Sequence, residues 1–325
     1  MRESPGGGVA MDVVVFWASG SSWEITGGGF AMGDGASCAW SSHGKREGAA
    51  EQRRRGKKIR FGHYTLQLLE DVGFLGYKSA STPMDSRSKL NITDNSPLLD
   101  PVGGERLVGQ HIYLTLSRPN ITYAVYCLSQ FLATPTTSHL QAAHKVLRYL
   151  KHKPGQGVFY SATSSLQIHA FSDSDLASFP DTSISVTGFC VFIGDSMVSC
   201  RSKKQPTIPR SSAKAEYRAL AATTAEVIWI SNLLSALQVI TPPPDILYCD
   251  KNSVVHMVSN PSFHERTKHN ELDKVKEGFI HLLPITLNHQ LVDAFAKPLP
   301  SLLLFSFCSP RWMCMISTVH LEGEY

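Results

Sequence analysis

The sequence has no Cys-x-x-Cys pair, and its number of cysteines is odd. The seven cysteines are Cys38, Cys127, Cys190, Cys200, Cys249, Cys308 and Cys314. Closely spaced cysteine pairs are typical of zinc sites, and an even number at regular spacing is typical of disulfide frameworks. The sequence therefore indicates neither kind of site, and we expect a reducing compartment.

Long apolar runs are also missing. The longest are about ten residues, whereas a helix that spans a bilayer needs roughly 20. The run 11–18 lacks the length and the cleavage context of a signal peptide. We therefore expect a soluble protein in the cytoplasm or nucleus, with no membrane partner.

The length and charge indicate a globular chain with an affinity for phosphate. At 325 residues and 42% apolar content, the chain can bury a full core, which we expect to be divided between two units. Its net charge is +4, and Lys and Arg cluster at 53–60, 145–153 and 201–210. Such clustering favours a nucleic-acid backbone over a uniformly charged surface.

Residues 1–58 are rich in Gly and Ser, have no sustained period and end in the basic run RRRGKK. We expect an unassigned, disordered leader, with a nuclear address as the alternative. The next segment predicts helices at 63–76, at 105–134 with a break at Pro119, and at 138–152.

After Gly157 the apolar period changes from helical spacing to alternation. Strands are predicted at 166–173, 186–195, 196–203, 246–249 and 279–285, with short helices at 252–258 and 288–297. A longer helix, 211–237, lies between the third and fourth strands. This order predicts a mixed α/β fold.

The 211–237 helix carries one misplaced charge. Its apolar side consists of Tyr217, Leu220, Ala221, Thr224, Val227, Ile228, Leu234 and Leu237, and Glu216 projects into the middle of that side. A carboxylate there costs several kcal/mol unless it is paired or holds a metal. The alternative is an ordinary first-turn Glu stabilised by the helix dipole, with Ser211 or Ser212 as N-cap.

Four carboxylates occupy comparable places in the predicted elements: Asp173, Glu216, Asp250 and Asp293. Strand ends and helix starts at one edge of an α/β sheet form its site crevice. Converging carboxylates repel unless divalent cations lie between them, and Mg²⁺ (or Mn²⁺) is the expected ion. Two such ions would clamp a phosphodiester. Asp175, two residues after Asp173, is the competing candidate for the first position.

A resemblance supports this hypothesis. The segments 105–136 and 142–157 resemble the piece that joins reverse transcriptase to ribonuclease H in the Pol polyprotein of copia-type LTR retrotransposons. FSDSDLAS, TGFCVFIGDSMVSCRSKKQPTIPRSSAKAEYRAL, LYCDKNSVVHMVSNPSFHERTKH and QLVDAFAKPLP resemble successive blocks of that ribonuclease H. The resemblance covers residues 61–300, in the family's order.

The resemblance implies a ribonuclease H-like mixed five-stranded sheet with flanking helices at 158–300. A mainly helical connection segment at 59–157 precedes it, and 301–325 is an unassigned tail. The implied activity is two-metal hydrolysis of the RNA strand of an RNA–DNA hybrid, with Asp173, Glu216, Asp250 and Asp293 as metal ligands. A reverse transcriptase supplied by another chain is a possible partner.

A group of basic and hydroxyl residues precedes the long helix. Lys203, Lys204, Arg210, Ser211 and Ser212 are candidates for holding backbone phosphates through side chains and helix N-terminal amides. The alternative is a capped, solvated turn.

The chain departs from the family in three places. It contains no Asp-Asp dipeptide, so we expect no polymerase active site. Helical residues that the family has after Asp273 are missing, which predicts an extended linker at 270–276 and a loosely supported fifth strand. After Pro300 the family pattern is lost. The alternative to the enzyme is therefore a decayed, non-catalytic remnant that at most binds nucleic acid. An integrase or transposase nuclease of the same fold is not supported by the local blocks.

Overall fold

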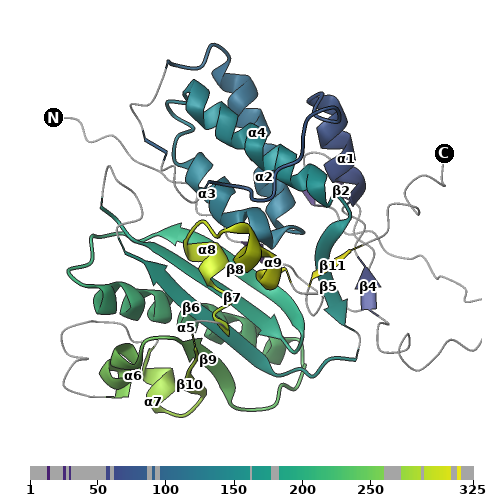
Figure 1. Cartoon of the computed structure of the whole chain (residues 1–325). Coiled ribbons are helices and arrows are strands. Elements are labelled where there is room, and N and C mark those ends of the chain that lie inside the picture. The colour runs from purple at the N-terminus through teal and green to yellow at the C-terminus, as the bar shows by residue number, and fades with distance from the viewer. Residues whose placement is uncertain are drawn as a thin grey trace, which may run out of the picture.

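The computed structural model describes residues 13–14, 25–26, 29–30, 56–58, 62–85, 90–91, 96–161, 163–176, 183–259, 272–286, 289–308 and 313–315 (Figure 1). Most of the predicted leader 1–58 and of the tail beyond residue 308 lies outside the described residues. Two short strands, β2 (Ile25–Thr26) and β3 (Gly29–Phe30), pair with each other.

The centre of the fold is a mixed sheet whose order is β1-β8-β7-β6-β9-β10. Its main strands are β6 (Ile168–Asp175), β7 (Val186–Ile193), β8 (Ser196–Lys204), β9 (Asp245–Cys249) and β10 (Ile280–Pro284). Strands β6, β7 and β8 pair antiparallel, whereas β9 runs parallel to both β6 and β10. The two-residue β1 (Val13–Val14) adds to the edge of β8. The predicted α/β class and the five predicted strands are confirmed.

Gly194 closes the β7–β8 hairpin in a left-handed conformation (φ +56°). A Cβ at this position would come within 2.2 Å of the Ser165 carbonyl oxygen, so the turn requires glycine both for its φ and for space.

Helix α5 (Ser212–Ala236) covers one face of the sheet. The Ser211 hydroxyl caps it by accepting a hydrogen bond from the Lys214 backbone N–H (3.2 Å). Its buried side packs on alternate residues of β6, β7 and β9 together with α6 (Asn252–Ser259). The prediction that Leu237 belongs to that side is wrong: the helix ends at Ala236, and Leu237 is 55% exposed as its C-cap.

The opposite face of the sheet is covered by the preceding helices and by the end of the chain. They are α1 (Gly62–Asp71), α2 (Pro101–Thr115), the 3-10 turn η2 (Pro119–Ile121), α3 (Thr122–Ser129), α4 (Thr137–His152), α8 (Asp293–Ala296) and α9 (Ser301–Phe307). Figure 1 shows α1 to α4 above the sheet and α8 and α9 in front of it, with α5 behind it. One hydrophobic cluster joins these helices to Phe171, Cys190 and Met197 of the sheet. The connection helices and the sheet therefore share a core.

One helix predicted near the end of the chain is shorter in the structure. The helix predicted at 288–297 is confined to α8 (Asp293–Ala296). Beyond Pro300, in the tail that we left unassigned because the family pattern is lost there, α9 buries Leu304 and Phe307 in the shared core. A short three-stranded sheet, β11-β5-β4, adds β11 (Met313–Met315) to β5 (Gln156–Ser161) and β4 (Gly56–Lys58).

The prediction of an extended linker at 270–276 is wrong where the structure describes it. Residues Asp273–Lys276 form the short helix α7, anchored by the fully buried Leu272 and ended by Gly278 at φ +80°. Strand β10 then pairs with β9 along its whole length, from Ile280 opposite Asp245 to Pro284 opposite Cys249. The missing residues therefore do not displace the fifth strand.

Helix α5 is long and apolar enough to span a membrane by length and composition. In the structure its apolar side is occupied by contacts with β6, β7 and β9. We therefore read it as a core helix.

Candidate functional site

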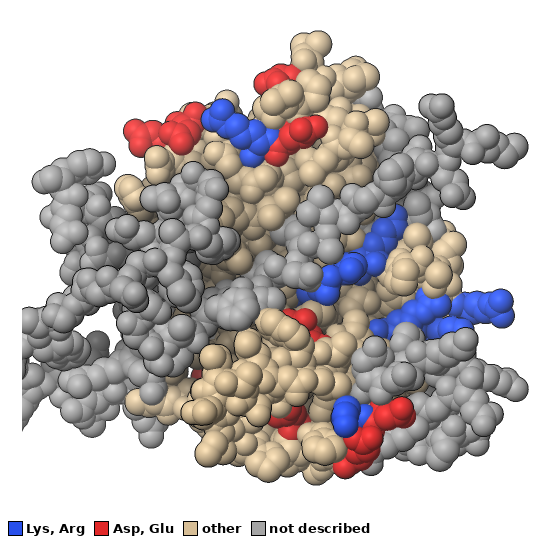
Figure 2. Space-filling model, turned by 180° about the vertical axis from the view of Figure 1, so that it is seen from behind, with Lys and Arg blue, Asp and Glu red and all other residues tan. Residues whose placement is uncertain are grey.

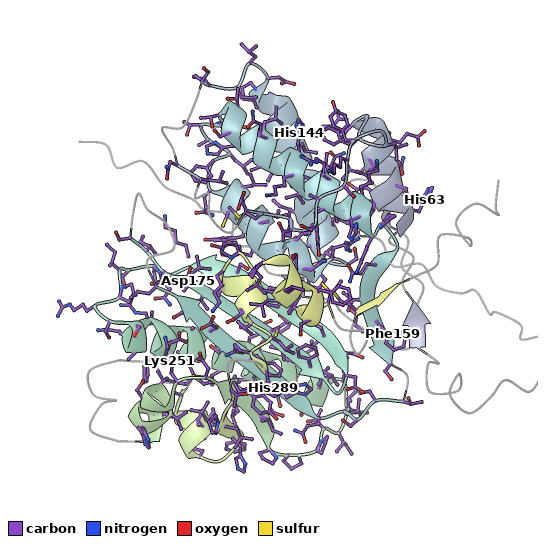
Figure 3. All side chains as sticks on the ribbon, viewed as in Figure 1. His63, His144, Phe159, Asp175, Lys251 and His289 are labelled. Carbon is purple, nitrogen blue, oxygen red and sulfur yellow. The ribbon has the colours of Figure 1, made fainter. Side chains whose placement is uncertain are left out.

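The four predicted carboxylates come from four elements that meet at one edge of the sheet. Asp173 lies near the end of β6, Asp250 directly follows β9, Glu216 lies in the first turns of α5, and Asp293 begins α8. Because β6 and β9 are parallel, their carboxyl ends share that edge. Figure 3 shows Asp175, near Asp173, and Lys251, next to Asp250, on the same side of the sheet.

Ligand atoms of Glu216 and Asp250 lie within 4.8 Å of each other, and Asp173 and Asp293 share Lys297 as an ion-pair partner. Burial raises the pKa of Asp173 well above its usual range, and the charges of Glu216 and Asp293 raise it further. Burial also raises the pKa of Glu216, and repulsion by Asp250 adds to this, while Lys251 acts in the opposite direction. The structure therefore brings all four predicted acids together.

Two lysines, which the sequence reasoning did not single out, lie among the acids. Lys251 Nζ is 2.8 Å from Glu216 Oε1, and Lys297 Nζ is 2.8 Å from Asp293 Oδ1 and 3.8 Å from Asp173 Oδ2. The spacing in the sequence could have indicated that these lysines lie near the acids. Lys251 directly follows Asp250, and Lys297 comes one helical turn after Asp293.

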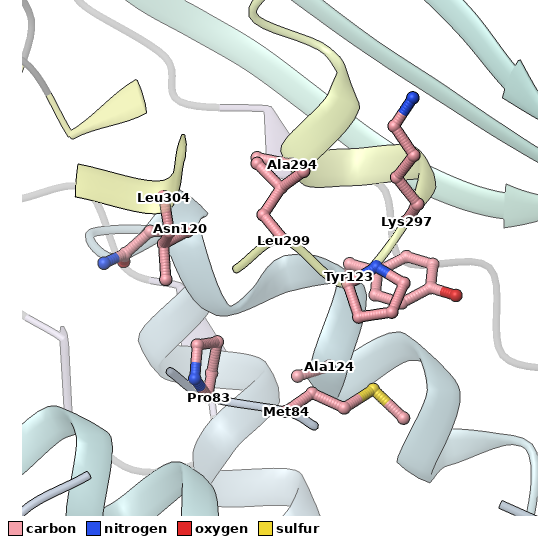
Figure 4. A pocket seen from close by; sticks show the side chains of 10 residues that line it. Pro83, Met84, Asn120, Tyr123, Ala124, Ala294, Lys297, Leu299 and Leu304 are labelled. Carbon is pink, nitrogen blue, oxygen red and sulfur yellow. The ribbon is translucent and has the colours of Figure 1, made fainter. Parts of the chain in front are cut away.

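Lys297 also borders a small pocket between α3, α8 and α9, lined by Met84, Tyr123 and Leu304 among others. In Figure 4 its side chain extends away from the other lining residues. The ammonium group thus serves the acidic site, whereas the aliphatic stem contributes to the pocket wall.

Some oxygens of the acidic cluster have no hydrogen-bond partner among the residues that the structure describes, although Asp173 Oδ2 lies 3.8 Å from Lys297 Nζ. Within the described part of the chain, Asp173 Oδ2, Glu216 Oε2 and Asp250 Oδ1 are buried and accept no hydrogen bond. Buried carboxylate oxygens normally have a partner. Oxygen donors of this kind fit a hard divalent cation.

Asp173 and Asp175, the two candidates for the first metal ligand, differ in their surroundings. Asp173 is buried and couples to Glu216 and Asp293. Asp175 is less buried, and its charge acts on Tyr123, Cys127 and Lys297. The deeper burial of Asp173 and the effect of the Glu216 charge on its pKa favour this residue over Asp175 as the first metal ligand.

A glycine allows α8 to approach the sheet beside Asp173. Gly188 pairs with Asp173 across β6 and β7. A Cβ at Gly188 would lie 2.9 Å from the backbone nitrogen of Ala296 and from the carbonyl carbon of Phe295. The missing side chain therefore sets the position of α8 and of Asp293.

The predicted phosphate-contacting group is only partly free for such contacts. Lys203, Arg210, Ser211 and Ser212 are exposed, but the Ser211 hydroxyl caps α5. The Lys204 backbone N–H donates to Tyr126 Oη (2.6 Å), which fixes the end of β8 against α3. Figure 2, which views the molecule from behind, shows basic side chains across the right of the described surface and others next to acidic side chains at its top and bottom.

The fold and the site define an α/β protein whose mixed sheet carries a cluster of four carboxylates and two lysines at one edge. No protein-family model matches the chain. It is 37% identical over 252 residues to the retrovirus-related Pol polyprotein from transposon RE1 of Arabidopsis thaliana, covering 76% of this chain and 17% of the relative. It is 27% identical over 250 residues to the corresponding polyprotein from transposon TNT 1-94 of Nicotiana tabacum, covering 73% of this chain and 19% of the relative.

A shorter relative is covered over most of its length. An uncharacterized mitochondrial protein of Arabidopsis thaliana is 40% identical over 168 residues, covering 52% of this chain and 70% of the relative. About three quarters of the chain is homologous to copia-type transposon Pol polyproteins, and the chain spans less than a fifth of the length of the RE1 and TNT 1-94 polyproteins.

Proposed function

We propose that the chain is a ribonuclease H that hydrolyses the RNA strand of RNA–DNA hybrids. The observation that carries the proposal is the convergence of Asp173, Glu216, Asp250 and Asp293, with three of their buried oxygens left without hydrogen-bond partners in the described structure. Its relation to Pol polyproteins of transposons supports a role in nucleic-acid processing.

The donor set fits Mg²⁺ or Mn²⁺, which take oxygen ligands. When bound, such ions supply positive charge that stabilises the attacking and leaving oxygens of a phosphodiester. Asp173 and Asp250, from adjacent parallel strands, would hold the centre of the site, with Glu216 and Asp293 on either side.

The lysines have a defined part in this proposal. Lys251 and Lys297 hold Glu216 and Asp293 in place through ion pairs of 2.8 Å. Each ammonium reduces the repulsion between carboxylates and so keeps the site compact before a cation binds.

Lys203 and Arg210, exposed near the N-terminus of α5, would contact the hybrid backbone. Such contacts position a nucleic acid without reading its sequence. We expect recognition of the hybrid through 2′-hydroxyls and minor-groove shape. A reverse transcriptase on another chain would supply the hybrid.

The second candidate is a non-catalytic remnant that binds nucleic acid. The lysines favour it in one respect, because ion pairs already neutralise part of the acidic cluster. The two candidates make different predictions about cleavage but similar predictions about binding.

The test is incubation of the full chain with a hybrid labelled on its RNA strand, in Mg²⁺ and in excess chelator. Double-stranded RNA and double-stranded DNA of the same sequence serve as controls. The enzyme predicts Mg²⁺-dependent cleavage of the hybrid RNA alone, abolished by Asp173→Asn. Binding of the hybrid without cleavage would support the remnant.

A further inference from the structure

We propose that Cys249 gives the acidic cluster a second kind of cation site, in which Cys249, Glu216 and Asp250 bind a thiophilic divalent ion such as Zn²⁺ or Cd²⁺. The site goes beyond the proposed nuclease, since neither Mg²⁺ nor Mn²⁺ needs a sulfur ligand.

The geometry of three side chains carries the inference. One ligand atom from each of Glu216, Cys249 and Asp250 lies within 4.8 Å of the other two. Cys249 is 1% exposed on β9, and the alternation of that strand directs it toward the same core as Leu247, on the α5 side of the sheet. Glu216 reaches this point from α5, and Asp250 follows Cys249 directly.

Two buried carboxylate oxygens without hydrogen-bond partners in the described structure are an independent indication that the site binds a ligand. Glu216 is 1% exposed, and among the described residues its Oε2 has no hydrogen-bond partner, although Lys251 holds its Oε1 at 2.8 Å. Asp250 Oδ1 is likewise buried and accepts no hydrogen bond there. Each carboxylate therefore presents an oxygen that no described donor uses.

The donor set selects the metal. Thiolate ligands favour Zn²⁺ and related soft ions, whereas Mg²⁺ requires an all-oxygen shell. Around zinc, sulfur and oxygen ligands stand at about 2.3 Å and 2.0–2.2 Å, so side-chain rotations must draw the three donors slightly closer. Three protein ligands leave a fourth position open to solvent. Binding replaces the S–H bond of Cys249 by a sulfur–metal bond, and the proton passes to solvent.

The site would share Glu216 and Asp250 with the proposed Mg²⁺ site. A thiophilic ion bound there and a full set of catalytic ions are therefore mutually exclusive. We infer that Zn²⁺ inhibits the proposed nuclease by occupying its ligands.

The experiment is a Cd²⁺ titration of the full chain, followed by the ultraviolet charge-transfer absorbance of a cadmium–thiolate bond. We expect this band in the native chain and in Cys308→Ser, a control at a cysteine outside the cluster. Cys249→Ser should abolish it. Glu216→Gln, which keeps the shape of the side chain and all cysteines, should raise the Cd²⁺ dissociation constant at least tenfold.

Retention of the band in Cys249→Ser, or an unchanged dissociation constant in Glu216→Gln, would overturn the site. If Cys249→Ser does not fold, the test is the Cd²⁺ dissociation constant of Glu216→Gln compared with that of Glu226→Gln, a variant on the same helix. The proposed site predicts weaker binding in Glu216→Gln alone. The absorbance needs no substrate, so a chain without nuclease activity can still show the site.

Discussion

Lys251 Nζ lies 2.8 Å from Glu216 Oε1. This ion pair explains how a carboxylate can lie in the apolar side of the long helix. Glu216 is buried in the apolar side of α5, with 1% of its surface exposed. A buried carboxylate requires a partner. Lys251 is that partner for one oxygen, and the other remains available to a cation.

Replacing Lys251 by Met should destabilise the fold. Glu216 then loses its counter-charge and takes up a proton instead. Because a third of the Lys251 side chain is exposed, we expect a moderate loss of about 1–3 kcal/mol, measured by urea unfolding. Lys274→Met is the control, since Lys274 pairs with the exposed Glu277, and a surface pair contributes at most ~1 kcal/mol. Equal losses in the two variants would show that the Lys251 pair is no stronger than a surface pair.

Gly188→Ala should impair cleavage by moving α8. The added methyl group would lie 2.9 Å from the α8 backbone at Ala296, so the helix and Asp293 must shift. A displacement near 1 Å costs up to ~100-fold in rate, which the hybrid cleavage assay would detect. Gly109→Ala on α2, where a Cβ meets nothing within 4 Å, should leave the rate unchanged. A Gly188→Ala rate equal to that of the native chain would contradict the role assigned to α8.

Acid should destabilise the connection helices through His111. Burial, with a smaller contribution from His144, lowers the pKa of His111 to about 3. Its unfolded value is ~6.5, so below this pH the unfolded chain binds more protons and stability falls as the pH decreases toward 3. The full slope is about 1.4 kcal/mol per pH unit.

The measurement for His111 is the free energy of unfolding between pH 7 and pH 5. His111→Leu should flatten the dependence, and His63→Leu, at an exposed position, should not. An unchanged slope in His111→Leu would assign the acid sensitivity to other groups.

Inserting five helix-forming residues between Asp273 and Lys274 should not accelerate cleavage. In the structure β10 follows helix α7 and pairs with β9 along its whole length. The strand is therefore not misplaced, and a longer helix would not improve its position. Initial rates of hybrid cleavage at matched Mg²⁺ compare the two chains. A faster insertion variant would mean that the shortened segment does limit the site.

The elements with strong periodicity were predictable because their patterns are local. Glu216 stood out as a charge inside an apolar side, and its neighbours on α5 mostly pack as the period predicts. The alternation at 166–173 predicted β6, although that strand continues to Asp175, two residues beyond the predicted end at Asp173. The short apolar run before Asp250 predicted the end of β9 correctly.

The features that were missed depend on contacts between distant residues. Strand β5 is defined partly by pairing with β11, where Val158 lies opposite Met313. The burial of Leu304 depends on packing against helices far earlier in the chain. The partner of Glu216 depended on how β9 and α5 pack, and neither segment alone specifies this.

We propose that Asp173, Glu216, Asp250 and Asp293 together form one divalent-cation site. The most direct measurement is a calorimetric Mg²⁺ titration of the native chain beside Glu216→Gln, with circular dichroism to verify the fold. Glu226→Gln on the same helix is the control, because it removes a charge outside the cluster and keeps an oxygen that accepts from Ser199 Oγ. We expect Mg²⁺ binding that is weakened at least tenfold in Glu216→Gln and unchanged in Glu226→Gln. Equal Mg²⁺ affinity in the native chain and in a folded Glu216→Gln variant would contradict this proposal.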